Sequence, residues 1–353
     1  PLAIRDMACH MNLKIQPSIV GRFNKPQIQN VIGMGSHEKK LRDELRGQPL
    51  IMSGGGIIDA NPHATIFKCK ELITRSFSPR ATLLGISVES GVRYGWARKW
   101  QLGRILKRFD VVYTRDILSE ITLKGILPRV RVETVGDLVL WLKPEAAELP
   151  ANIKLPKNYI AVTLTPRWRN EESWRNWIAN ELRILHREIK LPIVFVPMSS
   201  EFDDDRDEHR AVAEILETFS PSIDYFLINA PLSPKAISFL FGAAILTISM
   251  RLHGCVMAYA QKTPFVALAY HPKLTGFCNT VDMGHSLLPK IPPEIQSENT
   301  YGYRFSDLTL PQGELLRIAI DSLSRRNYSR LTELREVSRI ALTNFIEDFK
   351  HGR

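Results

Sequence analysis

The sequence predicts two α/β domains in tandem, each with a mostly parallel sheet, followed by long C-terminal helices. In the first half, short apolar runs alternate with helical patterns; a stretch rich in proline and charge interrupts them at 143–157, and the alternation then restarts. A length of 353 residues also exceeds one ordinary core. We expect an N-terminal domain over 1–150, a second domain over 157–325, and a helix over 326–353 that packs back on the body.

The apolar runs of the first half have the length and β-branched content of buried parallel strands. Helical patterns fit between them, and we expect the last helix to end at Gly125, because glycine commonly terminates helices. The candidate strands are 30–34, 49–52, 81–86, 111–114 and 130–135, and the candidate helices are 64–75, 99–108 and 117–124.

The second half repeats this pattern and contains a β-α-β unit. An apolar run at 243–249 precedes a helix of small residues at 254–261, and Thr263-Pro264 stops that helix before a strand at 265–270. Two such domains are expected to hold their ligand in a cleft between them. Further candidates are strands at 159–164, 193–197 and 224–227, helices at 172–190, 207–218, 311–325 and 328–349, an acidic loop at 201–208 and an irregular polar stretch at 282–303.

Composition restricts the classes of partner without choosing one. The formal net charge of +10 favours anions such as nucleic acid, acidic membrane surfaces or phosphorylated metabolites. No apolar run reaches the roughly 20 residues that span a bilayer, and no secretory leader is visible, so we expect a cytoplasmic protein. The four cysteines lack paired spacing and are expected to be free thiols. The acidic loop lacks an ordered ligand spacing, so we interpret it as solvated and predict no metal.

Cationic or titratable side chains interrupt the β-α-β unit where its strands end. Arg251 and His253 follow the first strand, and Lys273 follows the second. Open parallel sheets bind ligands at the carboxyl ends of their strands, where a helix N-terminus adds free N–H groups. The pattern predicts an anion site that suits any phosphate-bearing ligand.

A set of motifs occurs in a fixed order over about residues 30 to 280. The motifs are Ser53-Gly-Gly-Gly-Ile-Ile-Asp59, Tyr113-Thr-Arg-Asp-Ile-Leu-Ser119, Gly136-Asp137, Arg251-Leu-His253 and His271-Pro-Lys273. Each motif alone is common, but their order and spacing resemble the polysaccharide pyruvyl transferase family. The Asn-x-Gly-Asp type segment usual in that family is not visible before Asn30.

Members of that family transfer the enolpyruvyl unit of phosphoenolpyruvate onto two hydroxyls of a sugar, forming a cyclic ketal and releasing phosphate. The resemblance implies two Rossmann-like domains facing each other across a cleft, in a GT-B-like arrangement, with phosphoenolpyruvate as the donor and no required cofactor or metal. It implies a donor site in the second domain, with the acceptor side in the first. The donor-binding set is Arg251, Leu252, His253, Lys273 and either Arg167 or Arg169.

Ketal formation suggests separate roles for these residues. Arg251 suits a planar carboxylate and Lys273 suits a phosphate. A proton must reach the methylene carbon, and His253 is the candidate acid because the pKa of an ordinary histidine lies near neutrality. The alternatives are a core histidine for His253, a surface salt bridge for Arg251 and an exposed loop residue for Lys273. His271 is either a second acid-base group or a turn residue before proline.

Strand alternation would point Arg167 and Arg169 to one side of the chain and Trp168 to the other, so that at least one arginine reaches the cleft. Alternatively, the arginines stack on Trp168, Trp174 or Trp177, which would form a structural or sugar-binding platform.

Gly54, Gly55 and Gly56 form either a tight turn or part of the cleft lining, and Asp59 is a candidate contact to acceptor hydroxyls. Asp116 and Ser119 are expected to cap and brace the helix that starts after Thr114.

We therefore expect a transferase that adds pyruvate to a saccharide, in exopolysaccharide or cell-wall glycan synthesis. A lipid-linked saccharide would be met at the inner membrane surface, where a basic exterior favours peripheral contact. The alternative function is a GT-B-type nucleotide-sugar glycosyltransferase, since one architecture serves many reactions. Nucleic-acid binding is not expected, because the sequence lacks a recognisable motif for it.

Overall fold

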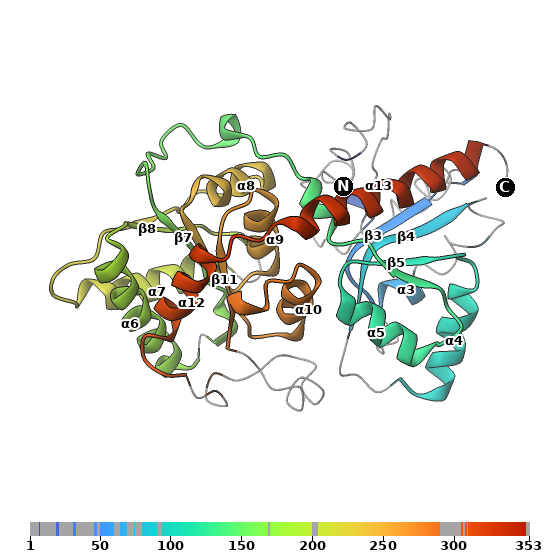
Figure 1. Ribbon diagram of the computed structural model, residues 1–353, viewed down its shortest axis with the longest axis horizontal. Helices are drawn as coiled ribbons and strands as arrows, with labels where there is room; N and C mark the ends of the chain where they lie inside the picture. Colours follow the sequence, from blue (N-terminus) through green and yellow to red (C-terminus); the bar gives the residue numbers. More distant parts are fainter. Residues whose placement is uncertain are drawn as a thin grey trace. The chain divides into compact units, whose positions relative to one another are not determined.

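The computed structural model of the chain divides into two compact units (Figure 1). Unit 1 comprises Pro1–Trp141 and Thr332–Arg353, and unit 2 comprises Leu142–Leu331. The stretch expected to be a linker, 143–157, is grouped with unit 2, where Lys235 Nζ donates to Glu145 Oε1 at 2.6 Å. The structure describes residues 50–59, 64–68, 80–89, 94–168, 170–199, 204–289 and 311–350, together with Met7, Ile19, Val20, Val31, Ile32, Arg46, Gly47, Thr74, Phe305, Leu308 and Leu310.

Unit 1 is built on a parallel sheet with the strand order β3-β4-β5-β6. Because this order follows the chain in one direction, right-handed connections place α3, α4 and α5 on one face. Figure 1 shows these helices on one side of the sheet and α13 on the other. The bounds are β1 Ile19–Val20, β2 Val31–Ile32, β3 Leu50–Ile58, α3 Thr65–Lys68, β4 Ala81–Val88, α4 Trp96–Leu106, β5 Val112–Thr114, α5 Ile117–Ile126, β6 Val132–Thr134, η1 Leu138–Trp141 and α13 Ser329–Lys350.

Several element ends predicted in unit 1 differ from those in the structure. The strand expected at 49–52 continues through the three glycines to Ile58, with register shifts after Ser53 and after Gly54. The helix expected to end at Gly125 continues to Ile126. Pro128 explains that end, because a residue before proline is disfavoured in the helical conformation, and Leu127 has a φ of −135°.

α13 is held to the rest of unit 1 by close packing and hydrogen bonds. Gly136 has a φ of +84°, and a Cβ atom there would lie 3.2 Å from the Leu334 Cβ of α13. Trp141 Nε1 donates to Ser338 Oγ at 2.8 Å, and Arg335 Nη2 donates to the Leu140 carbonyl at 2.6 Å. Because Gly136 has no side chain, α13 can pack close to the backbone at this position.

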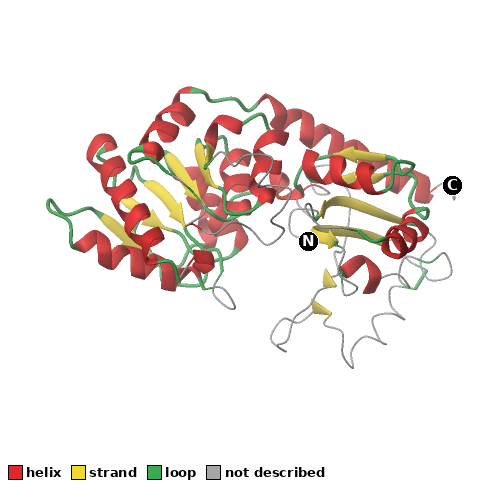
Figure 2. Cartoon of the chain, turned by 90° about the horizontal axis from the view of Figure 1, so that it is seen from below, coloured by secondary structure: helices red, strands yellow, loops and turns green. Residues whose placement is uncertain are grey.

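Unit 2 is built on a parallel sheet with the strand order β12-β11-β10-β7-β8-β9, and Figure 2 shows helices on both sides of it. The order reverses between β7 and β10, and open α/β sheets bind ligands at the carboxyl side of such a switch point. The bounds are η2 Ala146–Glu148, β7 Ile160–Thr163, η3 Pro166–Trp168, α6 Glu172–Ile189, β8 Ile193–Phe195, α7 Asp205–Glu217, β9 Tyr225–Leu227, α8 Pro234–Ala243, β10 Leu246–Ser249, α9 Leu252–Ala260, β11 Phe265–Leu268, α10 Pro272–Thr280, η4 Gly284–Ser286, β12 Leu287–Leu288 and α12 Glu314–Ser324.

The stretch predicted as irregular, 282–303, contains regular structure in its described part. It includes the 3-10 turn η4 and the edge strand β12, which pairs with β11. A strand of two residues shows no alternation, so the sequence pattern could not reveal it. Within the described residues, no helix is both long and apolar enough to cross a membrane.

Candidate functional site

The residues predicted to bind the donor lie, where the structure describes them, at the carboxyl edge of the unit 2 sheet. Arg251 and His253 follow β10, Lys273 follows β11, and Arg167 follows β7. β7, β10 and β11 are parallel neighbours, so their carboxyl ends meet at this edge. The residues predicted at the ends of separate strands therefore lie together near the switch point between β7 and β10.

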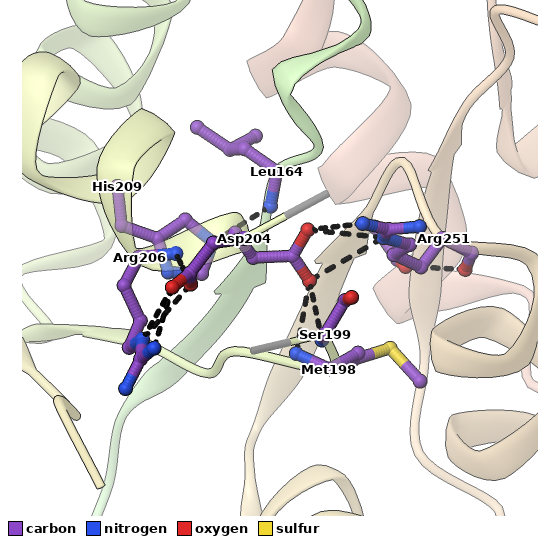
Figure 3. A network of polar contacts seen from close by, with 9 residues as sticks. Leu164, Met198, Ser199, Asp204, Arg206, His209 and Arg251 are labelled. Atoms are coloured by element: carbon purple, nitrogen blue, oxygen red, sulfur yellow. Dashed lines mark hydrogen bonds and ion pairs between the residues drawn. The ribbon is translucent and has the colours of Figure 1, made fainter. Parts of the chain in front are cut away.

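Arg251, labelled in Figure 3, is the N-cap residue of α9. Its guanidinium is held by Asp205. Arg251 Nε donates to Asp205 Oδ1 at 3.0 Å, and Nη2 donates to the same oxygen at 2.5 Å. The Asp205 side chain is fully buried, whereas that of Arg251 is 22% exposed. The expected surface salt bridge exists, but its acidic partner belongs to the interior. The pair fixes the guanidinium while part of the side chain still meets solvent.

Backbone amides complete the surroundings of the Asp205 carboxylate. The N–H groups of Met198 and Ser199 donate to Asp205 Oδ2 at 2.9 Å and 3.1 Å. Burial raises the pKa of Asp205, while the hydrogen bonds from Arg251 and the two amides oppose that shift. Since all these neighbours are donors, they compensate a charge that would otherwise be costly to bury.

The acidic stretch at 201–208 is not solvated throughout its described part. Asp204 caps α7 and accepts from Arg206 Nε at 2.8 Å, whereas Asp205 and Glu208 are fully buried. Interpreting the whole stretch as solvated carboxylates is therefore wrong. The sequence does contain a signal for this burial. The helix that includes Asp205 follows a parallel strand, and such a helix begins at the carboxyl edge of the sheet, where Arg251 also lies.

His209 lies one turn after Asp205 in α7 and is also buried. Its Nε2 accepts the Leu164 N–H at 2.9 Å, at the end of β7. Burial, with a smaller contribution from the Arg251 charge, lowers the pKa of His209 to about 3. The ring is thus a neutral brace behind the site rather than a proton carrier.

His253 lies in the first turn of α9, and its side chain is exposed, which excludes the core-histidine alternative. Leu252, also predicted in the donor set, is buried. A Cβ atom on Gly254 would lie 2.3 Å from Ser249 Oγ, which donates to the Arg251 carbonyl at 2.6 Å. The turn that presents Arg251 and His253 therefore depends on a glycine that the sequence analysis did not single out.

Lys273 and His271 lie at the start of α10. His271 is the N-cap residue, and its Nδ1 accepts the Lys273 N–H at 3.2 Å. The Lys273 ammonium lies 5.3 Å from the centre of the Tyr270 ring, a cation–π contact that directs the side chain. His271 therefore has the turn role, and an acid-base role for it stays a prediction.

Strand alternation does not apply to Arg167. β7 ends at Thr163, and Pro166–Trp168 forms a 3-10 turn, because proline fixes a φ that is compatible with such a turn. Arg167 is exposed at the carboxyl edge and Trp168 is buried. Arg169 lies outside the described residues.

The tryptophans near this turn do not form an open platform. The rings of Trp168 and Trp174 are edge to face, 4.8 Å apart, and both side chains are buried. Phe305 packs on Trp168, Trp174 and Trp177. The alternative of a sugar-binding platform on Trp168 and Trp174 is therefore wrong, because their faces are covered.

The predicted acceptor residues belong to unit 1. Gly54, Gly55 and Gly56 are exposed parts of the extended strand β3 rather than a tight turn, and Asp59 follows the strand, half-buried. A Cβ atom on Gly55 would lie 3.3 Å from Arg115 Nη1. A role for these residues in acceptor binding stays a prediction.

The Thr-Arg-Asp motif forms a buried network beside that strand. Asp116 caps α5 by accepting the Ser119 N–H at 2.8 Å, and Ser119 Oγ accepts the Val88 N–H at 3.1 Å. This confirms that Asp116 and Ser119 cap and brace the helix. Arg115 Nε donates to Asp116 Oδ2 at 3.2 Å, and Arg115 Nη1 lies 3.9 Å from Asp137 Oδ2.

The described part of the chain contains two of the four cysteines. No group of three or more His, Cys, Asp or Glu is placed there to hold a metal ion. Cys255 and Cys278 are buried free thiols, and burial raises the pKa of Cys255 to about 12. Cys9 and Cys69 lie outside the described residues.

Known proteins relate this chain to one sequence family and to one fold. A family model described as polysaccharide pyruvyl transferase matches residues 19–272. The UDP-GlcNAc 2-epimerase structure from Methanocaldococcus jannaschii is similar with a TM-score of 0.54 and 14% identity, covering 95% of this chain and 88% of that chain. The S. aureus MnaA co-structure with UDP has a TM-score of 0.53 and 14% identity, covering 100% and 93%. These likenesses confirm the GT-B-like class of two Rossmann-like domains. No curated protein sequence matches significantly.

Proposed function

Because the chain belongs to the polysaccharide pyruvyl transferase family, we propose that it transfers pyruvate from phosphoenolpyruvate to a pair of sugar hydroxyls as a cyclic ketal. The product would be an exopolysaccharide or a cell-wall glycan, and the acceptor a saccharide that is either free or lipid-linked. The observation that best supports the proposal is Arg251 at the switch point, fixed by the buried Asp205 and followed in the same helical turn by the exposed His253.

Phosphoenolpyruvate presents a carboxylate and a phosphate on one small frame. In the proposed complex Arg251 binds the carboxylate, since guanidinium matches its planar geometry, and Lys273 binds the phosphate as a point charge. Arg167, exposed at the same edge, completes the clamp. Neither a metal nor a cofactor takes part in this proposal.

His253 is the proposed proton carrier. It gives a proton to the methylene carbon of the donor, which leaves positive character on the carbon that bears the phosphate. The first sugar hydroxyl adds to that carbon and gives up its proton. The phosphate then leaves with the electrons of its C–O bond, and the second hydroxyl adds and loses its proton, closing the ketal. An ordinary histidine near its pKa can act as acid in one step and as base in the next.

The test compares the site variants with a matched pair on the last turn of α6. Phosphate release is measured with phosphoenolpyruvate and a glycan acceptor, and ketal formation is checked by the mass of the product. His253→Ala should lower kcat roughly a hundredfold or more, and Arg251→Ala should mainly raise the KM for phosphoenolpyruvate. His186→Ala and Arg187→Ala should leave both constants unchanged, since that turn leads into the amino end of β8. Full turnover by both site variants would refute the assignment.

A nucleotide-sugar glycosyltransferase is the rival that the test must separate. Calorimetry with phosphoenolpyruvate and with a UDP-sugar distinguishes the two reactions. The proposal expects heat with phosphoenolpyruvate that Arg251→Ala reduces. Tight UDP-sugar binding without any response to phosphoenolpyruvate would favour the rival.

A further inference from the structure

The outer face of α4 in unit 1 exposes large aromatic side chains among cations. Trp96 is 83% exposed and Trp100 is 58% exposed, and these are the two most strongly exposed aromatic side chains in the described part of the chain. Tryptophan is highly buried on average, so two exposed copies one turn apart require an explanation. The α4 face consists of Trp96, Lys99, Trp100, Arg104 and Lys107, all of them exposed.

Helical spacing places these side chains together. Trp96, Trp100 and Arg104 follow one another at intervals of four residues, and the buried Leu102 and Leu106 anchor the opposite side of α4 to the sheet. The Arg104 guanidinium lies 4.8 Å from the centre of the Trp100 ring. The face is therefore one continuous aromatic and basic surface, presented by a helix whose inner side is fixed.

The charge of this surface has one sign. Residues 95–109 contain five lysines and arginines and no aspartate or glutamate. α5, the next helix in the same layer, adds the exposed Ile117 and Ile121, which are 42% and 61% exposed. Indole rings favour the boundary between headgroups and acyl chains, and lysine and arginine next to them contact lipid phosphates.

We propose that the α4 face docks the protein on an anionic lipid bilayer, with the two indoles in the headgroup region and the basic side chains on lipid phosphates. A second copy is a poorer occupant, because a two-fold contact would set the three cations of one α4 face against the same three cations of the other. Nucleic acid is also poorer, because exposed isoleucines gain little from stacked bases but much from acyl chains. This inference concerns how the protein reaches a membrane surface, and it does not depend on the proposed reaction.

The experiment is flotation of the full chain with two kinds of vesicle, phosphatidylcholine alone and phosphatidylcholine mixed with phosphatidylglycerol. The wild type should bind the anionic vesicles much more strongly, and added salt should release it. Trp96→Ala with Trp100→Ala should weaken binding roughly tenfold or more, and Lys99→Gln with Lys107→Gln should do the same on anionic vesicles only.

The matched controls lie in unit 2. Lys154→Gln with Lys157→Gln removes the same charge from an exposed stretch, and Phe226→Ala removes an aromatic ring that is 43% exposed. Both should float like the wild type. Circular dichroism checks the fold, and Trp96→Ala alone is the milder variant, because a side chain that is 83% exposed packs against little.

Any of four results would overturn the inference. The first is that the wild type does not float with anionic vesicles. The second is that the variant with both Trp96→Ala and Trp100→Ala binds them as strongly as the wild type. The next is that the wild type is a dimer by sedimentation velocity, that the tryptophan variant is a monomer, and that the wild type does not bind vesicles. The last is that the wild type binds a single-stranded oligonucleotide but not vesicles, and that the tryptophan variant does not bind the oligonucleotide.

Discussion

Replacing Asp205 with asparagine should release Arg251 from its fixed position. Five hydrogen bonds reach the carboxylate at 2.5–3.3 Å: Arg251 Nε donates to both oxygens, and Arg251 Nη2 and the N–H groups of Met198 and Ser199 donate one each. The NH₂ group of asparagine would face donors and find no acceptor among them. Removing one partner of a buried pair costs about 3–5 kcal/mol, and the partial exposure of Arg251 lets it rehydrate, so we expect about 2–3 kcal/mol.

The measurement is the free energy of unfolding in denaturant, with Asp204→Asn as the matched control. Asp204 also pairs with an arginine, but its side chain is 21% exposed and caps α7, and asparagine caps helices equally well. The control should lose less than about 1 kcal/mol. Asp205→Asn should also raise the KM for phosphoenolpyruvate about tenfold or more while changing kcat less, because it loosens a binding group.

A double-mutant cycle tests whether Asp205 acts through Arg251. In the background of Arg251→Gln, Asp205→Asn should add little further loss in kcat/KM, since the side chain that it positions is already gone. The reasoning is refuted if Asp205→Asn unfolds at the wild-type denaturant concentration with an unchanged KM, or if its effect on kcat/KM is the same with and without Arg251.

Gly254→Ala should cost about 1–3 kcal/mol of stability and lower turnover, because its Cβ would lie 2.3 Å from Ser249 Oγ. The control in the same thermal melts is Gly125→Ala in α5, where a Cβ would have no atom within 4 Å, and this variant should be more stable than the wild type by up to about 1 kcal/mol. An unaffected Gly254→Ala would show that α9 does not need this close approach. The pKa of His209 is lowered by burial from 6.5 to about 3, so the unfolded chain takes up a proton first as the pH falls. Stability should therefore decrease below pH 6.5 by about 2 kcal/mol on reaching pH 5. His209→Gln, which can still accept the Leu164 N–H, should flatten that part of the pH profile, and an unchanged slope would contradict a neutral buried ring.

The local part of the site could be predicted from the sequence. The strand, turn and helix around Arg251 and His253 lie within one short segment, and both residues occupy the carboxyl edge as expected. The contact between Arg251 and Asp205 could not be found in this way, because it joins positions 46 residues apart. It depends on the neighbours of β7 in the sheet, and local periodicity carries no information on strand order.

Irregular backbone caused the other differences. Glycines weaken a strand pattern, so the sequence does not predict that β3 continues through Gly54, Gly55 and Gly56. In the structure, Arg115 packs close to Gly55, in space that a side chain would otherwise occupy. A proline after β7 replaced the expected alternation with a 3-10 turn, so Arg167 lies in a turn rather than in a strand. In both places the sequence pattern did not predict the path of the chain.

The grouping of α13 with the first unit has a consequence for the order of folding during synthesis. Unit 2 is one uninterrupted stretch, Leu142–Leu331, so it can fold as soon as that stretch has left the ribosome. Unit 1 is made of Pro1–Trp141 and Thr332–Arg353, and the helix whose Leu334 packs against Gly136 is translated after unit 2. Most of unit 1 is therefore synthesised before unit 2 but completed only after it, and until then the surface that receives α13 stays uncovered.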